Sequence, residues 1–212
     1  MILFDLDGTL VDTAPDLGLA LNMQRERHGL PPLSQAAIRP YASHGSKGLL
    51  SVGFGLTPED RQFAEMREEY LVLYDEVFTR SPRLFEGVAE TLAVIEGRKI
   101  PWGIVTNKPR RFSAPLIHAM QLEPRISCLV CGDDAVRPKP YPDTLLMACK
   151  MTDSDAATCM YVGDAERDIQ AGRAAGMKTV VALFGYIDAT DKPAEWGADV
   201  MIAQPEELLA LI

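Results

Sequence analysis

Two aspartates, Asp5 and Asp7, stand two positions apart directly after the apolar run Ile2-Leu3-Phe4. Side chains two apart on an extended strand face the same side, so both carboxyls can converge on one reacting centre. Gly8 allows a tight turn off the strand end, and Thr9 adds a hydroxyl group. One carboxylate can attack phosphorus and form an acyl phosphate. The other can protonate the leaving oxygen and then deprotonate an attacking water. The structural alternative is that these acids only cap a turn or a helix.

Further polar residues follow later apolar runs. The hydroxyl of Thr106, with the backbone N–H of Asn107, can bind a phosphoryl oxygen. Lys139 lies between two prolines that stiffen its backbone, and a fixed ammonium offsets crowded negative charge. Lys108 and Arg137 are alternative cations for this role. A surface turn with a solvated lysine is the structural alternative.

A second acidic pair, Asp164 and Asp168, follows the run Ala157 to Val162, and the two acids are one helical turn apart. Mg²⁺ prefers oxygen ligands and keeps several waters, so one or two carboxylates and a substrate phosphate suffice to hold it. Asp164 could instead cap the following helix, or do both.

The apolar runs that carry these residues alternate with helical patterns, which predicts βαβ units and a parallel sheet. Ligands of such sheets bind beyond the carboxyl ends of the strands, where these polar residues lie. The expected strands cover 2–4, 102–106, 127–131, 157–162, 178–183 and 199–202, and the expected helices 88–96, 113–120, 142–150, 167–175 and 205–211.

The stretch from about residue 14 to 83 breaks this rhythm and shows helical patterns only, over about 16–28, 33–39, 47–52 and 58–78. We therefore expect residues 1–13 and 84–212 to form one α/β domain, and residues 14–83 a separate all-helical domain inserted after the first strand.

The motifs in this order, Asp5-Leu-Asp-Gly-Thr-Leu, Thr106, Lys139 and Val162-Gly-Asp, resemble those of the haloacid dehalogenase superfamily of phosphohydrolases over nearly the whole chain. The resemblance implies a Rossmann-like core with a helical cap domain, as in the phosphoglycolate phosphatase-like branch. It implies that Asp5 is the nucleophile, that Asp7 is the general acid and base, and that Thr106 and Lys139 hold the phosphoryl group. It further implies Mg²⁺ bound by Asp5, the backbone carbonyl of Asp7 and Asp164, with Asp168 supporting the site.

Segments such as Leu84-Phe-Glu-Gly87, Trp102–Pro109, Phe184–Ile187 and Trp196–Asp199 are similar to a proteobacterial set of these phosphatases. That similarity implies a small acidic phosphate ester as substrate, with 2-phosphoglycolate as the first expectation and N-acetylmuramic acid 6-phosphate as the alternative. A sugar phosphomutase is a more distant alternative, and the cap pattern that would protect an aspartyl phosphate from water is not identifiable.

Substrate selection should lie in the inserted helices, since the core motifs recognise only phosphoryl group and metal. Gly8, Thr9 and Asn107 are candidate substrate contacts in the core, and Ser46 and Lys47 in the segment Ala42–Gly48. Lys47 or Arg39 could receive a substrate carboxylate.

The composition narrows the partners. The formal net charge is −9, with 21 Lys and Arg against 30 Asp and Glu, which argues against nucleic acid as the default partner. No apolar stretch is long enough to cross a membrane. Cys128 and Cys131 have CxxC spacing, but no second pair completes a zinc set, so buried thiols in a reducing, cytoplasmic compartment are the expectation. We expect a monomer or homodimer.

Overall fold

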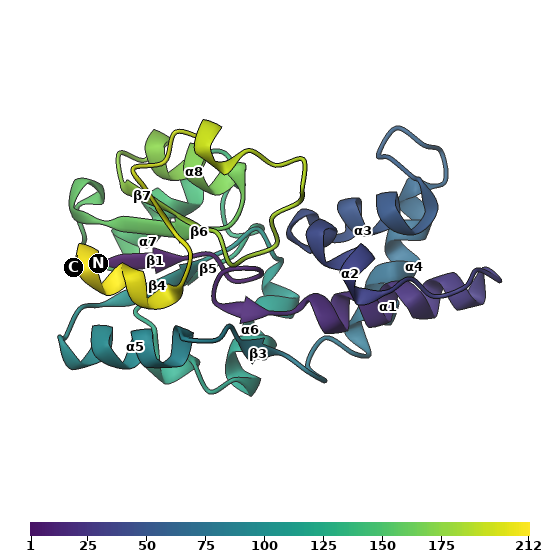
Figure 1. Ribbon diagram of the computed structural model, residues 1–212, viewed down its shortest axis with the longest axis horizontal. Coiled ribbons are helices and arrows are strands. Elements are labelled where there is room, and N and C mark those ends of the chain that lie inside the picture. The colour runs from purple at the N-terminus through teal and green to yellow at the C-terminus, as the bar shows by residue number, and fades with distance from the viewer.

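The computed structural model describes residues 1–212, and its main feature is a parallel sheet of six strands in the order β5-β4-β1-β6-β7-β8 (Figure 1). The expected α/β class with a parallel sheet is confirmed. The strands are β1 (Ile2–Phe4), β4 (Trp102–Val105), β5 (Leu129–Val130), β6 (Met160–Gly163), β7 (Lys178–Ala182) and β8 (Val200–Ile202).

Strand β1 lies at the centre of the sheet, paired with β4 on one side and β6 on the other. Its side chains alternate between two apolar layers, as the pleat requires. Ile2 and Phe4 face the layer formed with α5 (Val88–Gly97) and α6 (Arg110–Ala119), whereas Leu3 faces the layer formed with α7 (Asp143–Met151) and α8 (Glu166–Ala174). Burial on both faces explains why the strands are short apolar runs without polar alternation.

Helices cover both faces of the sheet, which fixes the position of every strand end. The helices of this core are α5 (Val88–Gly97), α6 (Arg110–Ala119), α7 (Asp143–Met151) and α8 (Glu166–Ala174), and its 3₁₀ segments are η2 (Glu123–Arg125), η3 (Ala156–Thr158), η4 (Pro193–Glu195) and η5 (Pro205–Leu211).

The helices between β1 and α5 gather at one end of the molecule, to the right in Figure 1, and we call residues 14–78 the helical lobe. It contains α1 (Ala14–Arg27), α2 (Gln35–Ile38), η1 (Arg39–His44), α3 (Gly45–Phe54) and α4 (Phe63–Asp75). The lobe has an apolar cluster of its own, in which Leu21, Leu49, Leu50 and Tyr70 are almost fully buried. Burial of these side chains holds the helices to one another, and Phe112 and Tyr186 join the same cluster from the core.

Two strands that the sequence did not predict join the lobe to the sheet. β2 (Val11–Asp12) pairs antiparallel with β3 (Arg83–Leu84), so the two chain crossings between lobe and core lie side by side. The buried Asp12 accepts hydrogen bonds from Arg39 (2.8 Å), Arg83 (3.2 Å) and the hydroxyl of Tyr186 (2.9 Å). These bonds connect the lobe, β3 and the loop after β7 at one carboxylate.

Several predicted boundaries are wrong, for local reasons. The helix expected over 58–78 is shorter, because the carboxylate of Asp60 accepts from the backbone N–H and hydroxyl of Thr57 and forms a turn before α4. Residues 205–211 form a 3₁₀ helix, and only Leu129 and Val130 of the run 127–131 pair in the sheet. Cys128 and Cys131 are free, buried thiols, and burial raises the pKa of each to about 11. No helix is long and apolar enough to span a bilayer.

Candidate active site

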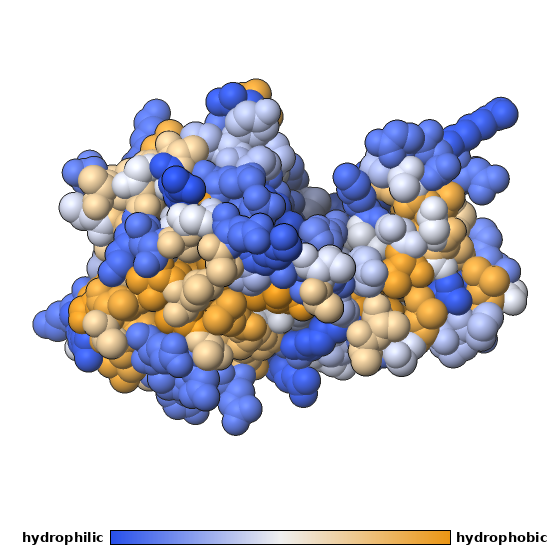
Figure 2. Space-filling view, turned by 45° about the horizontal axis from the view of Figure 1, so that its top comes forward, coloured by the Kyte–Doolittle hydropathy of each residue, from blue (hydrophilic) through white to orange (hydrophobic).

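The polar residues that follow β1, β4 and β6 meet at one edge of the sheet, facing the helical lobe. A cavity of about 890 Å³ opens there between core and lobe, and Figure 2 shows the molecular surface notched between the two parts. Core residues of the cavity wall are Asp5, Asp7, Thr106, Asn107, Lys108, Lys139 and Arg167. The residues that follow these strands therefore line one common cavity.

Asp5 lies at the base of this cavity, directly after β1, and is only 4% exposed. Its Oδ1 accepts from the backbone N–H of Leu6 at 2.8 Å and lies 2.9 Å from Nζ of Lys139. Both of these contacts use Oδ1, so Oδ2 has no protein donor. Burial raises the pKa of Asp5, and the ammonium of Lys139 opposes that rise.

Lys139 holds Asp5 and Asp168 together, and its side chain is completely buried. Its Nζ lies 2.7 Å from Asp168 Oδ1 and donates to the hydroxyl of Tyr161 at 2.7 Å. Burial opposes the charged form, yet the carboxylates of Asp168 and Asp5 raise the pKa of Lys139 above its ordinary value. The group is therefore an ammonium ion that neutralises two carboxylates.

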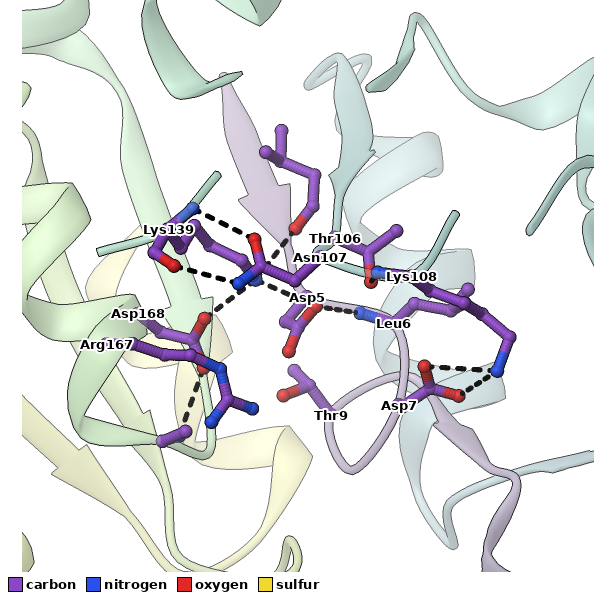
Figure 3. Close-up of polar contacts among 12 residues, drawn as sticks. Asp5, Leu6, Asp7, Thr9, Thr106, Asn107, Lys108, Lys139, Arg167 and Asp168 are labelled. Atoms are coloured by element: carbon purple, nitrogen blue, oxygen red, sulfur yellow. Dashed lines mark hydrogen bonds and ion pairs between the residues drawn. The ribbon is translucent and has the colours of Figure 1, made fainter. Parts of the chain in front are cut away.

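Asn107 fixes the backbone of Lys139 (Figure 3). Its Nδ2 donates to the Lys139 carbonyl and its Oδ1 accepts from the Lys139 N–H, both at 2.9 Å. Both polar atoms of the Asn107 side chain are thus used by Lys139. Of Asn107, only the backbone N–H remains available to contact a substrate. Thr106 Oγ1 accepts from the N–H of Lys108 at 3.1 Å, which leaves the Thr106 hydroxyl proton free to donate into the cavity.

Asp164 follows β6, lies beside Asp5 and is only 1% exposed to solvent. Its Oδ2 accepts from the hydroxyl of Ser43 in the lobe at 2.6 Å and from the N–H of Tyr186 at 2.9 Å. Burial, followed by the charges of Asp5 and Asp168, raises the pKa of Asp164 to about 7. A carboxyl in these surroundings gains from a nearby cation.

Gly8 and Thr9 lie against Asp164 and outside the cavity wall. A Cβ atom on Gly8, whose φ is +88°, would collide with the Asp164 carboxylate, so glycine is required there for steric as well as conformational reasons. Thr9 Oγ1 lies 3.4 Å from Asp164 Oδ1. Their place in the structure fits the support of Asp164 better than contact with substrate.

Carboxylate oxygens of Asp5, Asp164 and Asp168 lie within 4.8 Å of one another, a set of hard oxygen donors that suits Mg²⁺. Asp168 is already used: Oδ1 is paired with Lys139, and Oδ2 accepts from the N–H of Ala165 at 3.0 Å. The only contact of Asp164 Oδ1 is the long one to Thr9, and the carboxylate of Asp5 lies beside it. These two residues therefore fit the ion, and Asp168 fits a supporting role.

Asp7 points away from Asp5 and toward Lys108 (Figure 3). Nζ of Lys108 lies 3.0 and 3.3 Å from the two Asp7 oxygens, and Thr13 Oγ1 donates to Asp7 Oδ1 at 2.5 Å. The sequence presented Lys108 as an alternative to Lys139; the structure gives the two lysines different carboxylates. Arg137 pairs with Asp143 on the surface instead.

The lobe supplies the opposite wall of the cavity. Ser46 and Lys47 both line it, as do His44 and Arg67. Ser46 Oγ accepts from Nε of Arg67 at 3.2 Å, whereas Lys47 is exposed and unpaired. Arg39, the other candidate for a substrate carboxylate, is engaged by Asp12 outside the cavity.

Arg167 was not singled out from the sequence, although it lies between Asp164 and Asp168 in the acidic motif. Its side chain lines the cavity beside Asp5, and its guanidinium donates to the backbone carbonyl of Ser43. It thus connects α8 to the lobe. The sequence signal that could have identified Arg167 is its position as a basic residue between Asp164 and Asp168.

Known proteins share this chain's sequence and fold. The family model described as haloacid dehalogenase-like hydrolase matches residues 2–182. An N-acetylmuramic acid 6-phosphate phosphatase of Pseudomonas aeruginosa is 40% identical over 211 residues, which cover 100% of this chain and 93% of the relative. A phosphoglycolate phosphatase of Xanthomonas campestris pv. campestris is 40% identical over 207 residues, which cover 98% and 93%. The crystal structure of a predicted phosphoglycolate phosphatase from Haemophilus somnus 129pt superposes with a TM-score of 0.85 at 25% identity, covering 100% of this chain and 96% of that one.

Proposed function

Because the chain belongs to the haloacid dehalogenase-like hydrolases and is a phosphoric monoester hydrolase, we propose that it acts through an aspartyl phosphate on Asp5, with Mg²⁺ as cofactor. The observation that carries this proposal is the Asp5 carboxylate at the base of the cavity, with one oxygen fixed by Lys139 and Leu6 and the other without a protein donor.

In the proposed reaction, Asp5 Oδ2 attacks phosphorus and the bond from phosphorus to the ester oxygen breaks. Asp7 gives a proton to the leaving alkoxide. Asp7 then takes a proton from a water molecule that attacks the same phosphorus, and the bond from Asp5 to phosphorus breaks. Inorganic phosphate and an alcohol are the products, and Asp5 returns to its initial state.

Other residues hold the phosphoryl group and balance its charge. The Thr106 hydroxyl and the Asn107 N–H would donate to phosphoryl oxygens. Lys139 keeps Asp5 oriented and offsets the charge that gathers on it. Mg²⁺, held by Asp5, Asp164 and the backbone carbonyl of Asp7, would neutralise the phosphate's negative charge when bound.

We propose that the helical lobe, with the linkers around it, is the domain expected over 14–83 and that it is a cap that covers the phosphoryl site. Contacts from Ser43 to Asp164 and from Arg167 to Ser43 support this role, because they join the lobe directly to the catalytic edge of the sheet.

The size of the cavity favours the larger of the two substrates named for the relatives. At roughly 30 Å³ per non-hydrogen atom, a generous value taken from liquid water, 2-phosphoglycolate fills at most about 270 Å³ and N-acetylmuramic acid 6-phosphate about 720 Å³. The cavity measures about 890 Å³. We therefore propose an acidic amino-sugar 6-phosphate as the preferred substrate, ahead of 2-phosphoglycolate.

A direct comparison tests this preference. Purified protein with Mg²⁺ should hydrolyse N-acetylmuramic acid 6-phosphate with a kcat/KM at least about tenfold above that for 2-phosphoglycolate, a difference of about 1.4 kcal/mol. Phosphate release is the measurement. A reversed order would restore 2-phosphoglycolate, and phosphoryl migration without phosphate release would indicate a mutase.

Mg²⁺ should stabilise the folded protein, because a ligand that binds only the folded state adds to its stability. At a Mg²⁺ concentration 100 times the Kd, the free energy of unfolding rises by about 2.7 kcal/mol. Protein stripped of metal with EDTA should therefore show a higher Tm once Mg²⁺ is added back. Asp164→Asn should lose this shift, whereas the surface variant Asp75→Asn should keep it. An unchanged shift in Asp164→Asn would remove Asp164 from the ligand set.

Lys47→Ala should weaken binding of an acidic substrate selectively. Losing one charge-assisted hydrogen bond costs about 1.5–3 kcal/mol. KM for N-acetylmuramic acid 6-phosphate should therefore rise by about tenfold or more, while KM for an aryl phosphate without a carboxylate stays within about twofold of the wild-type value. Steady-state kinetics on both esters is the check. Equal increases would place the substrate carboxylate elsewhere, with Arg67 as the next candidate.

A further inference from the structure

Lys108 makes contacts in the cavity that phosphoryl binding does not require. It follows β4 in the loop that carries Thr106, and its side chain is only 6% exposed. Its Nζ reaches both oxygens of Asp7, at 3.0 and 3.3 Å, and donates to the hydroxyl of Tyr74 at 2.8 Å. Tyr74 belongs to α4 of the helical lobe. The three protons of the ammonium are thus shared between a core carboxylate and a lobe hydroxyl.

Tyr74 belongs to the lobe and also packs against the core, with its ring centroid 5.0 Å from that of Phe112 in α6. It is 2% exposed, stacks on Tyr70 with ring centroids 6.0 Å apart, and has its ring 4.9 Å from Nζ of Lys108. A displacement of the lobe relative to the sheet removes a hydrogen-bond acceptor and a ring face from Lys108. The position of the ammonium therefore depends on the position of the lobe.

Asp7 in turn depends on Lys108. Its other side-chain contact is with the hydroxyl of Thr13, at the first crossing from core to lobe. Lys108 is the only cation paired with Asp7, whereas Lys139 serves Asp5 and Asp168. Loss of the Lys108 ammonium would leave the Asp7 carboxyl, which is 17% exposed, held at Oδ1 by the Thr13 hydroxyl alone, with no partner for Oδ2.

We propose that Lys108 is the positioning residue for Asp7 and that, through Tyr74, it makes proton transfer by Asp7 dependent on the docked lobe. The proposal rests on the proposed function, since it assigns Asp7 the proton transfer. Lys108 acts through Asp7 and not on the phosphoryl group. The alternative, in which Lys108 binds the phosphoryl oxygens directly, makes a different kinetic prediction.

The test compares two leaving groups. The leaving group of a primary alkyl phosphate is an alkoxide, which needs a proton from Asp7. The leaving group of 4-nitrophenyl phosphate is a stable phenolate, which does not need one. Because kcat/KM reports only the steps up to formation of the aspartyl phosphate, Lys108→Met should lower kcat/KM for the alkyl ester by about 10²-fold or more, and for the aryl ester by at most about threefold.

Tyr74→Phe removes a single oxygen and supplies the second variant. It should lower the ratio of alkyl to aryl kcat/KM in the same direction, by about three- to tenfold. Lys108→Arg should restore part of the ratio, and Lys150→Met, on the exposed face of α7, should leave both esters unchanged. Circular dichroism of each variant checks that it is folded.

Equal losses on both esters in Lys108→Met would overturn the positioning role and indicate phosphoryl binding. An unchanged ratio in Tyr74→Phe would overturn the connection to the lobe. A wild-type protein that hydrolyses neither ester would count against the proposed function itself, before any variant is compared.

Discussion

Replacing Asp5 with asparagine should abolish phosphate ester hydrolysis and leave the fold intact. An amide oxygen is a poor nucleophile, and loss of a nucleophile that acts together with its partners lowers kcat by about 10⁴-fold or more. Asn keeps the shape of the side chain and can still accept at Oδ1 from Leu6 and Lys139, which now hold the carboxylate. The measurement is turnover of 4-nitrophenyl phosphate with Mg²⁺.

The control for this variant is Asp75→Asn, at the exposed end of α4, which should retain full turnover. Thermal unfolding of both proteins should be cooperative. Without a nucleophile, only a small residual activity is expected. Turnover by Asp5→Asn within about tenfold of wild type, in protein free of contaminating phosphatase, would therefore contradict the role of Asp5 as nucleophile.

Lys139→Met should remove activity and destabilise the protein together. The Lys139 side chain is fully buried against Asp5 and Asp168, so methionine leaves two buried carboxylates without a counter-ion. Breaking a buried pair from one side costs about 3–5 kcal/mol. The free energy of unfolding from urea titration should fall by this amount at neutral pH, while the exposed control Lys150→Met should change it by less than about 0.5 kcal/mol.

The stability deficit of Lys139→Met should depend on pH in a defined direction. Burial already raises the pKa of Asp5, and loss of the Lys139 ammonium that opposes this rise raises it further, so the folded variant binds more protons than the unfolded chain. Stability of the variant then falls as the pH rises above about 4. The deficit relative to wild type should shrink as the pH is lowered toward about 4. A deficit that is the same at pH 4 and pH 7 would show that lost packing, not unpaired charge, is its cause.

The sheet and the residues at its strand ends could be predicted from sequence because both follow local rules. Short buried runs alternating with helices specify a parallel sheet, and the carboxyl ends of parallel strands lie at one edge. Asp5, Thr106 and Asp164 each stand directly after such a run. Their common location therefore needed no knowledge of contacts between distant segments.

Contacts that cross between lobe and core could not be predicted in this way. Lys108 pairs with Asp7 and Tyr74, residues far from it in sequence, and nothing in its neighbourhood distinguishes it from a solvated lysine. Arg39 carries the charge expected of a substrate contact, yet it forms an ion pair with the buried Asp12. These pairings depend on how two separately packed units meet, which hydrophobic periodicity does not specify.

Chemical trapping of the intermediate tests the central claim most directly. Borohydride reduces an aspartyl phosphate to homoserine, so protein quenched during turnover of 4-nitrophenyl phosphate can be digested and its N-terminal peptide sequenced by mass spectrometry. Asp7→Asn, which should slow hydrolysis of the intermediate, raises the trapped fraction. Homoserine is expected at position 5, and only when substrate and Mg²⁺ are present. Turnover with an unmodified Asp5, or with homoserine at another aspartate, would contradict it.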